Sequence, residues 1–349
     1  MISPLRARMK RIIPSAFALA LASVSVLSVQ SCELCSIYNT EAWQTEKSSG
    51  FVFSLSELFI PFRTEQLDGE DTSSRRPDYL DSSITHLVPT YNFAKNFGVS
   101  LNVPIIYRDF KRKSVVVGAN RRLIVATEEG TESGLGDTAL IGRWTAFQRR
   151  EMEWSVVFNV LAGVKFPTGD AEPLRDEAVQ VRRYNLLVGP GHVHDALGIP
   201  VSGVHARDVS LGSGSFDGIF GTALNLRYGR WFFNNQVQYY LRTEGESTYE
   251  YGNEFMVSGG PGAYLISADK WTLSLQANAA YETMARDELF GKKSNHTGMT
   301  SWYLGPLVNL TLGERFSANV GVDVPLRIAN NGFQNVPDYR IHGGVAWRF

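Results

Sequence analysis

From residue 51 to the carboxyl terminus, the chain repeats one pattern, in which apolar residues stand at every second position with polar or small residues between them. The stretch "WSVVFNVLAGVKF" at residues 154–166 is an example. A period of two predicts a β-strand with one apolar and one polar face. About twelve such segments of about ten to thirteen residues occur, a length that suits a tilted strand crossing a membrane. The pattern therefore predicts an all-β fold.

The connections between these segments alternate in length. Short turns are expected near residues 94–96, 148–152, 229–230, 267–270 and 313–315. Long polar connections are expected at residues 63–82, 108–136, 167–214, 243–253, 284–297 and 329–337. Long loops on one side and tight turns on the other are typical of an outer-membrane barrel. We therefore expect residues 51–349 to form a transmembrane antiparallel up-and-down β-barrel of about twelve strands, with long extracellular loops, short periplasmic turns and both ends periplasmic.

The two faces of the predicted strands differ in chemistry. The apolar face carries aromatic residues at strand ends, among them Tyr107, Trp231 and Trp271, which suit the two membrane–water boundaries. The alternative, a soluble sandwich with a solvated polar face, does not explain strands of this length with aromatic edges. The polar face then lines the lumen, and its charged candidates are Asp137, Arg143, Lys165, Asp217, Arg227, Arg242, Glu254, Glu282, Asp323 and Arg327. They form either a selectivity ring or structural ion pairs, and their nearly balanced signs argue against strong charge selectivity.

One strand interrupts the alternation. Continuing Phe51, Phe53 and Leu55 by two places Glu57 on the lipid side, where a charge is costly. We therefore expect a β-bulge near residues 56–57 that turns Glu57 inward and residues 58, 60 and 62 outward.

The amino-terminal segment has the features of an export signal. Four cationic residues among the first eleven precede an apolar or small run from Ile12 to Val29. We assign residues 1–31 to a signal peptide, residues 32–50 to a periplasmic segment and the mature protein to the bacterial outer membrane. A formal net charge of -1 gives no indication of a nucleic-acid partner.

The periplasmic segment holds Cys32 and Cys35, the two cysteines of the chain, in a C-x-x-C pair. Ser36 stands where covalent haem attachment needs histidine, which excludes that cofactor. Three alternatives remain: a dithiol or disulfide, lipidation of Cys32 in the lipobox-like string "VQSC", or an incidental pair.

The longest loop contains two further candidates. His192 and His194 in "GPGHVHDALG" share one side of an extended segment and are a weak candidate for a metal site, against a merely solvated loop. Residues 171–184, "AEPLRDEAVQVRRY", predict a short helix with Leu174, Ala178 and Val181 on one face. This helix either folds inward and constricts the pore or lies on the surface.

The chain ends on "YRIHGGVAWRF", a strand that alternates to a terminal Phe349. This tail resembles the carboxyl-terminal signal that bacterial barrel-assembly machinery reads, and Phe349 also fits an aromatic boundary. Several phrases in order resemble the outer-membrane transporters named for the meta-pathway of phenol degradation: "HLVPTYNFAKNFGVSLNVPIIYRDF", "SGLGDTALIGRW", "LAGVKFPTGD", "GSGSFDGIFGTALNLRYGRWFFNNQVQYYLRTEG" and "GGPGAYL". The resemblance covers residues 51–349 and implies a barrel for passage of small, often apolar compounds.

We therefore expect a passive channel for small solutes, without a cofactor and embedded in outer-membrane lipid. The alternative is a scaffold barrel that holds a redox partner through the Cys32–Cys35 segment. An outer-membrane hydrolase needs Ser and His together on the lipid-facing surface, and the apolar face offers no His. We accordingly expect no enzymatic activity. Oligomeric state and the presence of a plug do not follow from the sequence.

Overall fold

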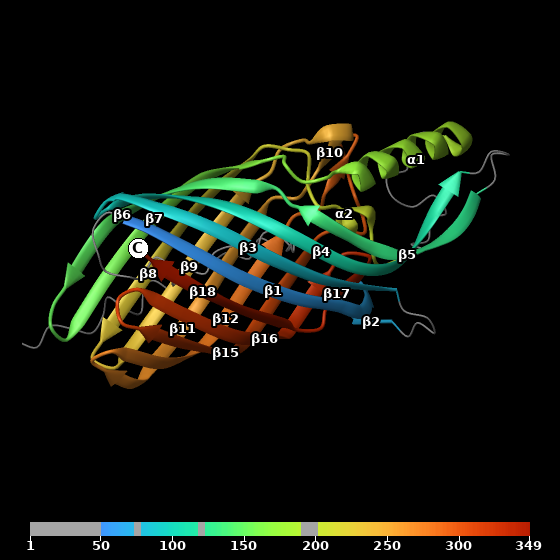
Figure 1. Ribbon diagram of the computed structural model, residues 1–349. Helices are drawn as coiled ribbons and strands as arrows, with labels where there is room; N and C mark the ends of the chain where they lie inside the picture. The colour runs from blue at the N-terminus through green and yellow to red at the C-terminus, as the bar shows by residue number, and fades with distance from the viewer. Residues whose placement is uncertain (1–49, 73–77, 118–122, 190–201) are drawn as a thin grey trace, which may run out of the picture.

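A computed structural model describes residues 50–72, 78–117, 123–189 and 202–349 (Figure 1). These residues form a closed antiparallel barrel of 12 strands, as predicted. The barrel strands are β1 (Gly50–Leu67), β3 (Tyr79–Ala94), β4 (Phe97–Val117), β6 (Thr138–Arg150), β7 (Trp154–Phe166), β8 (Asp217–Tyr228), β9 (Trp231–Leu241), β11 (Glu254–Ala268), β12 (Trp271–Met284), β15 (Met299–Leu312), β16 (Phe316–Asn330) and β18 (Arg340–Arg348). Each pairs with the next, and β1 pairs with β18 as well as with β3, which closes the cylinder.

The other elements lie at the loop end of the barrel. They are β2 (Glu70–Asp71), β5 (Leu123–Leu135), α1 (Glu172–Val188), α2 (Ala206–Val209), η3 (Glu246–Thr248), β10 (Tyr249–Glu250), β13 (Glu288–Leu289), β14 (Lys292–Lys293) and β17 (Phe333–Pro337). The predicted loop at 108–136 is in large part a β-hairpin, because β4 continues past the barrel and pairs with β5. Cross-strand ion pairs such as Arg112–Glu128, 2.7 Å between Nε and Oε2, replace apolar contacts there.

The turns and the two described ends of the sheet gather at the opposite end, which contains the carboxyl terminus in Figure 1. Tight turns with Gly229 (φ 56°) and Gly313 (φ 59°) join β8 to β9 and β15 to β16, and glycine adopts this left-handed backbone without a steric penalty. The N–H of Phe349 donates to the carbonyl of Phe51 at 3.0 Å. An even number of strands thus returns the chain to the periplasmic, short-turn side.

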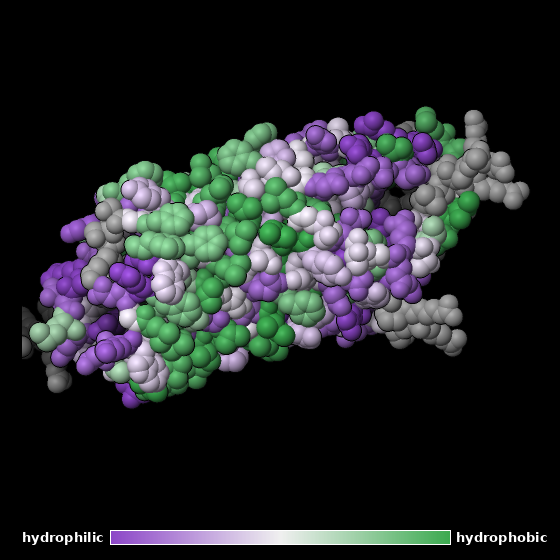
Figure 2. Space-filling view, viewed as in Figure 1, coloured by the Kyte–Doolittle hydropathy of each residue, from purple (hydrophilic) through white to green (hydrophobic). Residues whose placement is uncertain are grey.

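The outer surface of the cylinder is apolar. Large hydrophobic side chains are exposed along every strand of the barrel wall, and Figure 2 shows them as a band between two polar ends. Tyr107, Trp302 and Tyr339 lie toward the loop end of this band, while Trp231, Trp271 and Trp347 lie toward the turn end. This is the arrangement expected of a surface that faces a bilayer.

The bulge predicted near residues 56–57 is wrong. The pairing of β1 with β18 runs unbroken from Val52 to Phe59, and its pairing with β3 is also continuous there. Glu57 therefore faces outward, where its carboxylate accepts hydrogen bonds from Ser83 and Thr85 of β3. The three residues that we expected to face outward are instead buried inside the barrel: Leu58, Ile60 and Phe62. An apolar segment of the long loop packs against them there.

The predicted helix is present as α1, and its apolar face is the one expected. Leu174 and Ala178 are buried against Tyr249, Tyr251 and Met284. The helix thus packs across the loop end instead of entering the lumen (Figure 1). No helix among the described residues is long and apolar enough to cross a membrane.

Candidate functional site

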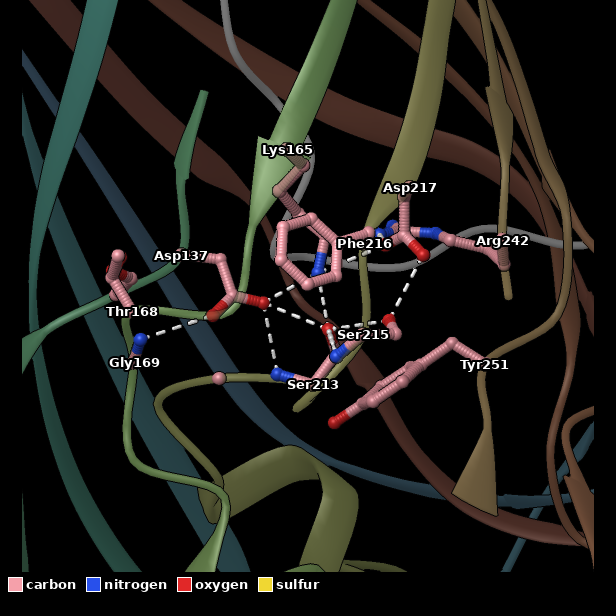
Figure 3. Close-up of polar contacts among 12 residues, drawn as sticks. Asp137, Lys165, Thr168, Gly169, Ser213, Ser215, Phe216, Asp217, Arg242 and Tyr251 are labelled. Carbon is pink, nitrogen blue, oxygen red and sulfur yellow. Dashed lines mark hydrogen bonds and ion pairs between the residues drawn. The ribbon is translucent and has the colours of Figure 1, made fainter. Parts of the chain in front are cut away.

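Five charged side chains form a chain of alternating sign inside the loop end of the barrel. Figure 3 shows the part from Asp137 to Arg242. Lys165 Nζ lies 2.5 Å from Asp137 Oδ2 and 2.9 Å from Asp217 Oδ2. Arg242 then links Asp217 (Nη1–Oδ2 2.8 Å) to Glu254 (Nη2–Oε2 3.2 Å). The sequence places these residues at the loop-side ends of consecutive strands, β6 to β11, and their alternation lets each carboxylate compensate a buried cation.

The segment 202–216 enters the lumen and is held by this charge chain. We call it the plug. Asp137 accepts hydrogen bonds from the Ser213 N–H (2.9 Å), the Ser213 hydroxyl (2.8 Å) and the Gly169 N–H (3.0 Å). The Ser215 hydroxyl donates to Asp217 at 2.9 Å. The charged groups therefore fasten the plug to the wall as well as to each other (Figure 3).

Apolar contacts hold the plug against the opposite wall. Val204 and Val209 pack into a buried cluster with side chains of β1, β3 and β4: Leu58, Ile60, Phe62, Leu80 and Phe110. Leu211 fills the next space, against Ile84 and Ile106. The plug thus spans the lumen from β3 and β4 to β7 and β8.

A buried ion pair joins the plug to the loops above it. Arg207 of α2 lies 2.6 Å from Asp287 (Nη1–Oδ2), and its guanidinium lies 5.0 Å from the ring of Tyr251. The Tyr249 hydroxyl donates to the same carboxylate at 2.5 Å. Burial and the nearby Asp287 raise the pKa of Tyr249 well above its usual range, so it keeps the proton that it donates.

Below the plug, the middle of the lumen holds a second set of paired charges. Arg340 of β18 makes a two-point contact with Glu282 of β12, with Nη2 2.5 Å from Oε2, and lies 3.9 Å from the ring of Tyr303. Asp323 accepts from Asn278 at 3.1 Å and lies 3.2 Å from His342 Nε2. These charges cross the lumen, and some polar atoms beside them, such as Gln238 Nε2, have no hydrogen-bond partner among the described residues.

Two adjoining cavities lie in the lumen between its middle and the periplasmic end. The upper one, about 150 Å³, is lined by amides of β9 and β12, including Gln236, Gln238 and Gln276. The lower one, about 530 Å³, lies at the turn end. Asn234 lines both, so they adjoin at that residue. The lumen is thus hollow from its middle to the periplasmic mouth, and its lining mixes polar and apolar side chains.

Most of the predicted lumen residues lie inside the barrel. Buried there are Asp137, Arg143, Lys165, Asp217, Arg242, Glu254, Glu282 and Asp323. Arg143 belongs to neither ionic group and donates to Thr145 (3.0 Å) and Asn92 (2.7 Å). Arg227 lies at the periplasmic mouth and lines the lower cavity. Their effect on permeation stays a prediction.

The prediction that Arg327 lines the lumen is wrong, because Arg327 lies on the outer face of the barrel. Trp302 pairs with Arg327 whereas Tyr303 pairs with Pro325, so Leu326 is an extra residue in β16. This bulge reverses the alternation, and Arg327 is exposed on the outward face of Trp302. A bulge of this kind leaves no signal in the local sequence.

Sequence reasoning did not identify the plug serines or Arg108. Ser213 and Ser215 stand in "GSGSFDG", where short polar residues before a strand gave only a loop signal. Arg108 is 1% exposed on the inner face of β4, and its Nε and Nη1 have no hydrogen-bond partner. It fell at the start of a segment predicted to be a loop.

Several predicted features fall on residues that the structure does not describe. Cys32 and Cys35, the signal peptide and the periplasmic segment lie outside the described residues, and so do His192 and His194. Within the described ranges, no group of three or more metal-ligating side chains gathers.

Comparisons with known proteins relate the chain to outer-membrane barrels through structure. No family model matches, and no curated protein matches the sequence. The COG4313 outer membrane channel from Pseudomonas putida F1 is similar with a TM-score of 0.56 at 12% identity, covering 90% of this chain and 100% of that chain. The fold is that of a bacterial outer-membrane β-barrel.

Two other channels are similar at lower scores. The CymD monoaromatic hydrocarbon channel gives a TM-score of 0.36 at 7% identity, over 88% of this chain and 90% of that chain. A Pseudomonas aeruginosa FadL homologue gives 0.34 at 8% identity, over 86% of this chain and 90% of that chain. These two likenesses add no argument. The apolar outer surface of the closed barrel and the fold shared with the COG4313 channel locate the protein in the outer membrane.

Proposed function

We propose that the protein is a passive outer-membrane channel for small solutes. The observation that carries this proposal is the hollow lumen, whose two adjoining cavities lead from its middle to the periplasmic mouth. A barrel that served only as a scaffold would gain stability by filling this space with side chains.

The plug is the gate of the proposed channel. It is held by packing and by hydrogen bonds of its side chains and backbone at separate points, not by strand pairing along its length. Its withdrawal from Asp137 and Asp217 would open the loop end without breaking the barrel. Segments that must move are drawn from the less stable parts of a fold.

We further assign the chain to the transporters named for the meta-pathway of phenol degradation. The ordered phrases at residues 86–110, 133–144, 161–170 and 212–245 support this assignment, and a narrow barrel suits the small solutes that the family implies.

Liposome swelling tests the channel. Proteoliposomes that contain the full chain are expected to admit solutes of a few heavy atoms and to exclude disaccharides. The variant Ser213→Ala/Ser215→Ala removes plug hydrogen bonds and is expected to swell faster. If both folded proteins admit no solute of any size, the channel function is overturned.

A further inference from the structure

The lower cavity, which we call the periplasmic vestibule, has two arginines on opposite walls. Arg227 projects from β8 and Arg348 from β18, and both line the 530 Å³ space. These strands are six pairings apart in either direction around the 12-stranded wall, so the two arginines line the cavity from opposite sides of the barrel.

Neither arginine has an ion-pair partner within the described part of the chain. Farther up the lumen, the carboxylates Asp217, Glu254 and Glu282 each contact a cation. In the vestibule, Glu314 is the one carboxylate among the lining residues, and its charge acts on Arg348. Arg230 adds a third cation, so the vestibule carries a positive surplus that concentrates small anions.

An aromatic wall lies beside Arg227. Phe232 is the cross-strand partner of Arg227 and is 9% exposed, and its ring centroid lies 5.2 Å from that of Tyr264. Gly262 makes room for the ring, because a Cβ there would lie 2.2 Å from Phe232 Cζ. The remaining lining is largely hydroxyl and amide groups. A cation and an apolar aromatic surface therefore stand side by side on adjacent strands.

We propose that the vestibule binds small aromatic carboxylates. The ring of the solute packs against Phe232 and Tyr264, its carboxylate pairs with Arg227, and Arg348 attracts the anion from the opposite wall. A planar guanidinium matches a carboxylate with two parallel hydrogen bonds, and aromatic rings pair edge to face or offset. An uncharged arene would leave Arg227 uncompensated. The proposal deepens the channel function and rests on it for its biological role, but binding itself does not depend on conduction.

Calorimetric titration of the full-length, detergent-solubilised protein tests the site with benzoate as the probe and benzyl alcohol as its neutral counterpart. Benzoate is expected to bind at least about tenfold more tightly, because a charge-assisted hydrogen bond is roughly twice as strong as a neutral one. Arg227→Gln should abolish the preference for benzoate over benzyl alcohol. Phe232→Leu should weaken the binding of benzoate but preserve this preference for the anion.

Arg149→Gln is the matched control, since Arg149 is an exposed rim arginine whose Nε lies 3.2 Å from Glu151 and which lies outside the vestibule. It should leave benzoate binding unchanged. Equal binding of benzoate and benzyl alcohol, or an unchanged preference in Arg227→Gln with folding verified by gel mobility, overturns the inference. Binding of benzoate by a protein that admits no solute in the swelling assay supports the site and overturns the channel instead.

Discussion

At the scale of single residues, Glu57 shows how a charge is tolerated on a lipid-facing surface. Its carboxylate is held by two hydroxyls on the neighbouring strand, Ser83 and Thr85. Its cross-strand neighbour on β18 is Gly343, which has no side chain to cover it. The local contacts reduce the cost of the charge without removing it.

Glu57→Leu is therefore expected to stabilise the barrel. An acidic residue on the lipid face costs up to about 2 kcal/mol, depending on depth, so we expect a gain of about 1 kcal/mol in the free energy of unfolding. Urea titration of the protein folded in phospholipid vesicles measures it. Glu57→Gln keeps the shape of the side chain and removes its charge. Its free energy of unfolding should lie between those of the wild type and Glu57→Leu. A less stable Glu57→Leu variant would show that the hydrogen bonds outweigh the charge.

The side chain of Phe349 makes few contacts within the barrel. Its ring is 73% exposed and lies 5.6 Å from the ring of Phe51. We propose that it is also the signal for the barrel-assembly machinery.

Phe349→Ala should consequently fold in vitro but assemble poorly in cells. We expect an unfolding free energy within about 1 kcal/mol of the wild type, because a largely exposed ring buries little area. Outer-membrane yield should fall several-fold, measured by fractionation. Phe51→Ala is the control, since it removes the other ring of the pair. Equal loss of yield in both variants would assign the effect to the contact and not to the signal.

At the scale of elements, the plug is joined to the loops above it as well as to the barrel wall. Arg207 of α2 pairs with Asp287, which also receives the Tyr249 hydroxyl and the Gly252 N–H. One carboxylate thus connects the plug to two loops, so the plug and the loop cap should open together.

Asp287→Asn is expected to loosen this unit and leave the barrel intact. Removing one partner of a buried ion pair costs about 3 kcal/mol, which corresponds to about a hundredfold faster amide exchange when opening is local. Hydrogen exchange read by mass spectrometry should show the increase in residues 202–216 and 246–252. Glu172→Gln, which removes an exposed ion pair with Arg175, serves as the control. Faster exchange throughout the strands would contradict a local role.

At the scale of the whole molecule, closure of the cylinder is what permits a membrane location. The pairing of β1 with β18 leaves no edge strand in the wall, so backbone polar groups are satisfied without water. The apolar band of Figure 2 surrounds this closed wall.

Closure predicts heat-modifiable electrophoretic mobility. The unboiled protein in dodecyl sulfate should migrate faster than the boiled protein, because the compact barrel resists the detergent. Deleting residues 340–349 removes β18 and leaves two unpaired edges, so it should abolish the fast form. Phe349→Ala keeps β18 and should retain it. A fast form in the deletion variant would mean that β16 pairs directly with β1.

The wall of the barrel was predictable from sequence, and its contents were not. The alternation of residues along a strand predicts which side chains share a face. It therefore predicted the apolar outer surface and the lumen positions of Asp137, Lys165 and Asp217. The alternation failed at Arg327, where a bulge reverses it. At Glu57 the alternation holds, and the bulge that we expected there is absent.

By itself, the sequence determined a closed, antiparallel cylinder with an apolar outer surface and a polar interior. Period-two patterning and alternating connection lengths are properties of consecutive residues, so they can be recognised in the sequence. Only the tertiary structure decided that segment 202–216 fills the lumen, which charges neutralise each other, and that Arg227 meets Phe232 beside an open cavity. The reason is physical: contacts such as that of Ser202 with Asp78, 124 residues apart in the chain and 2.6 Å apart in space, depend on how the strands curve and close.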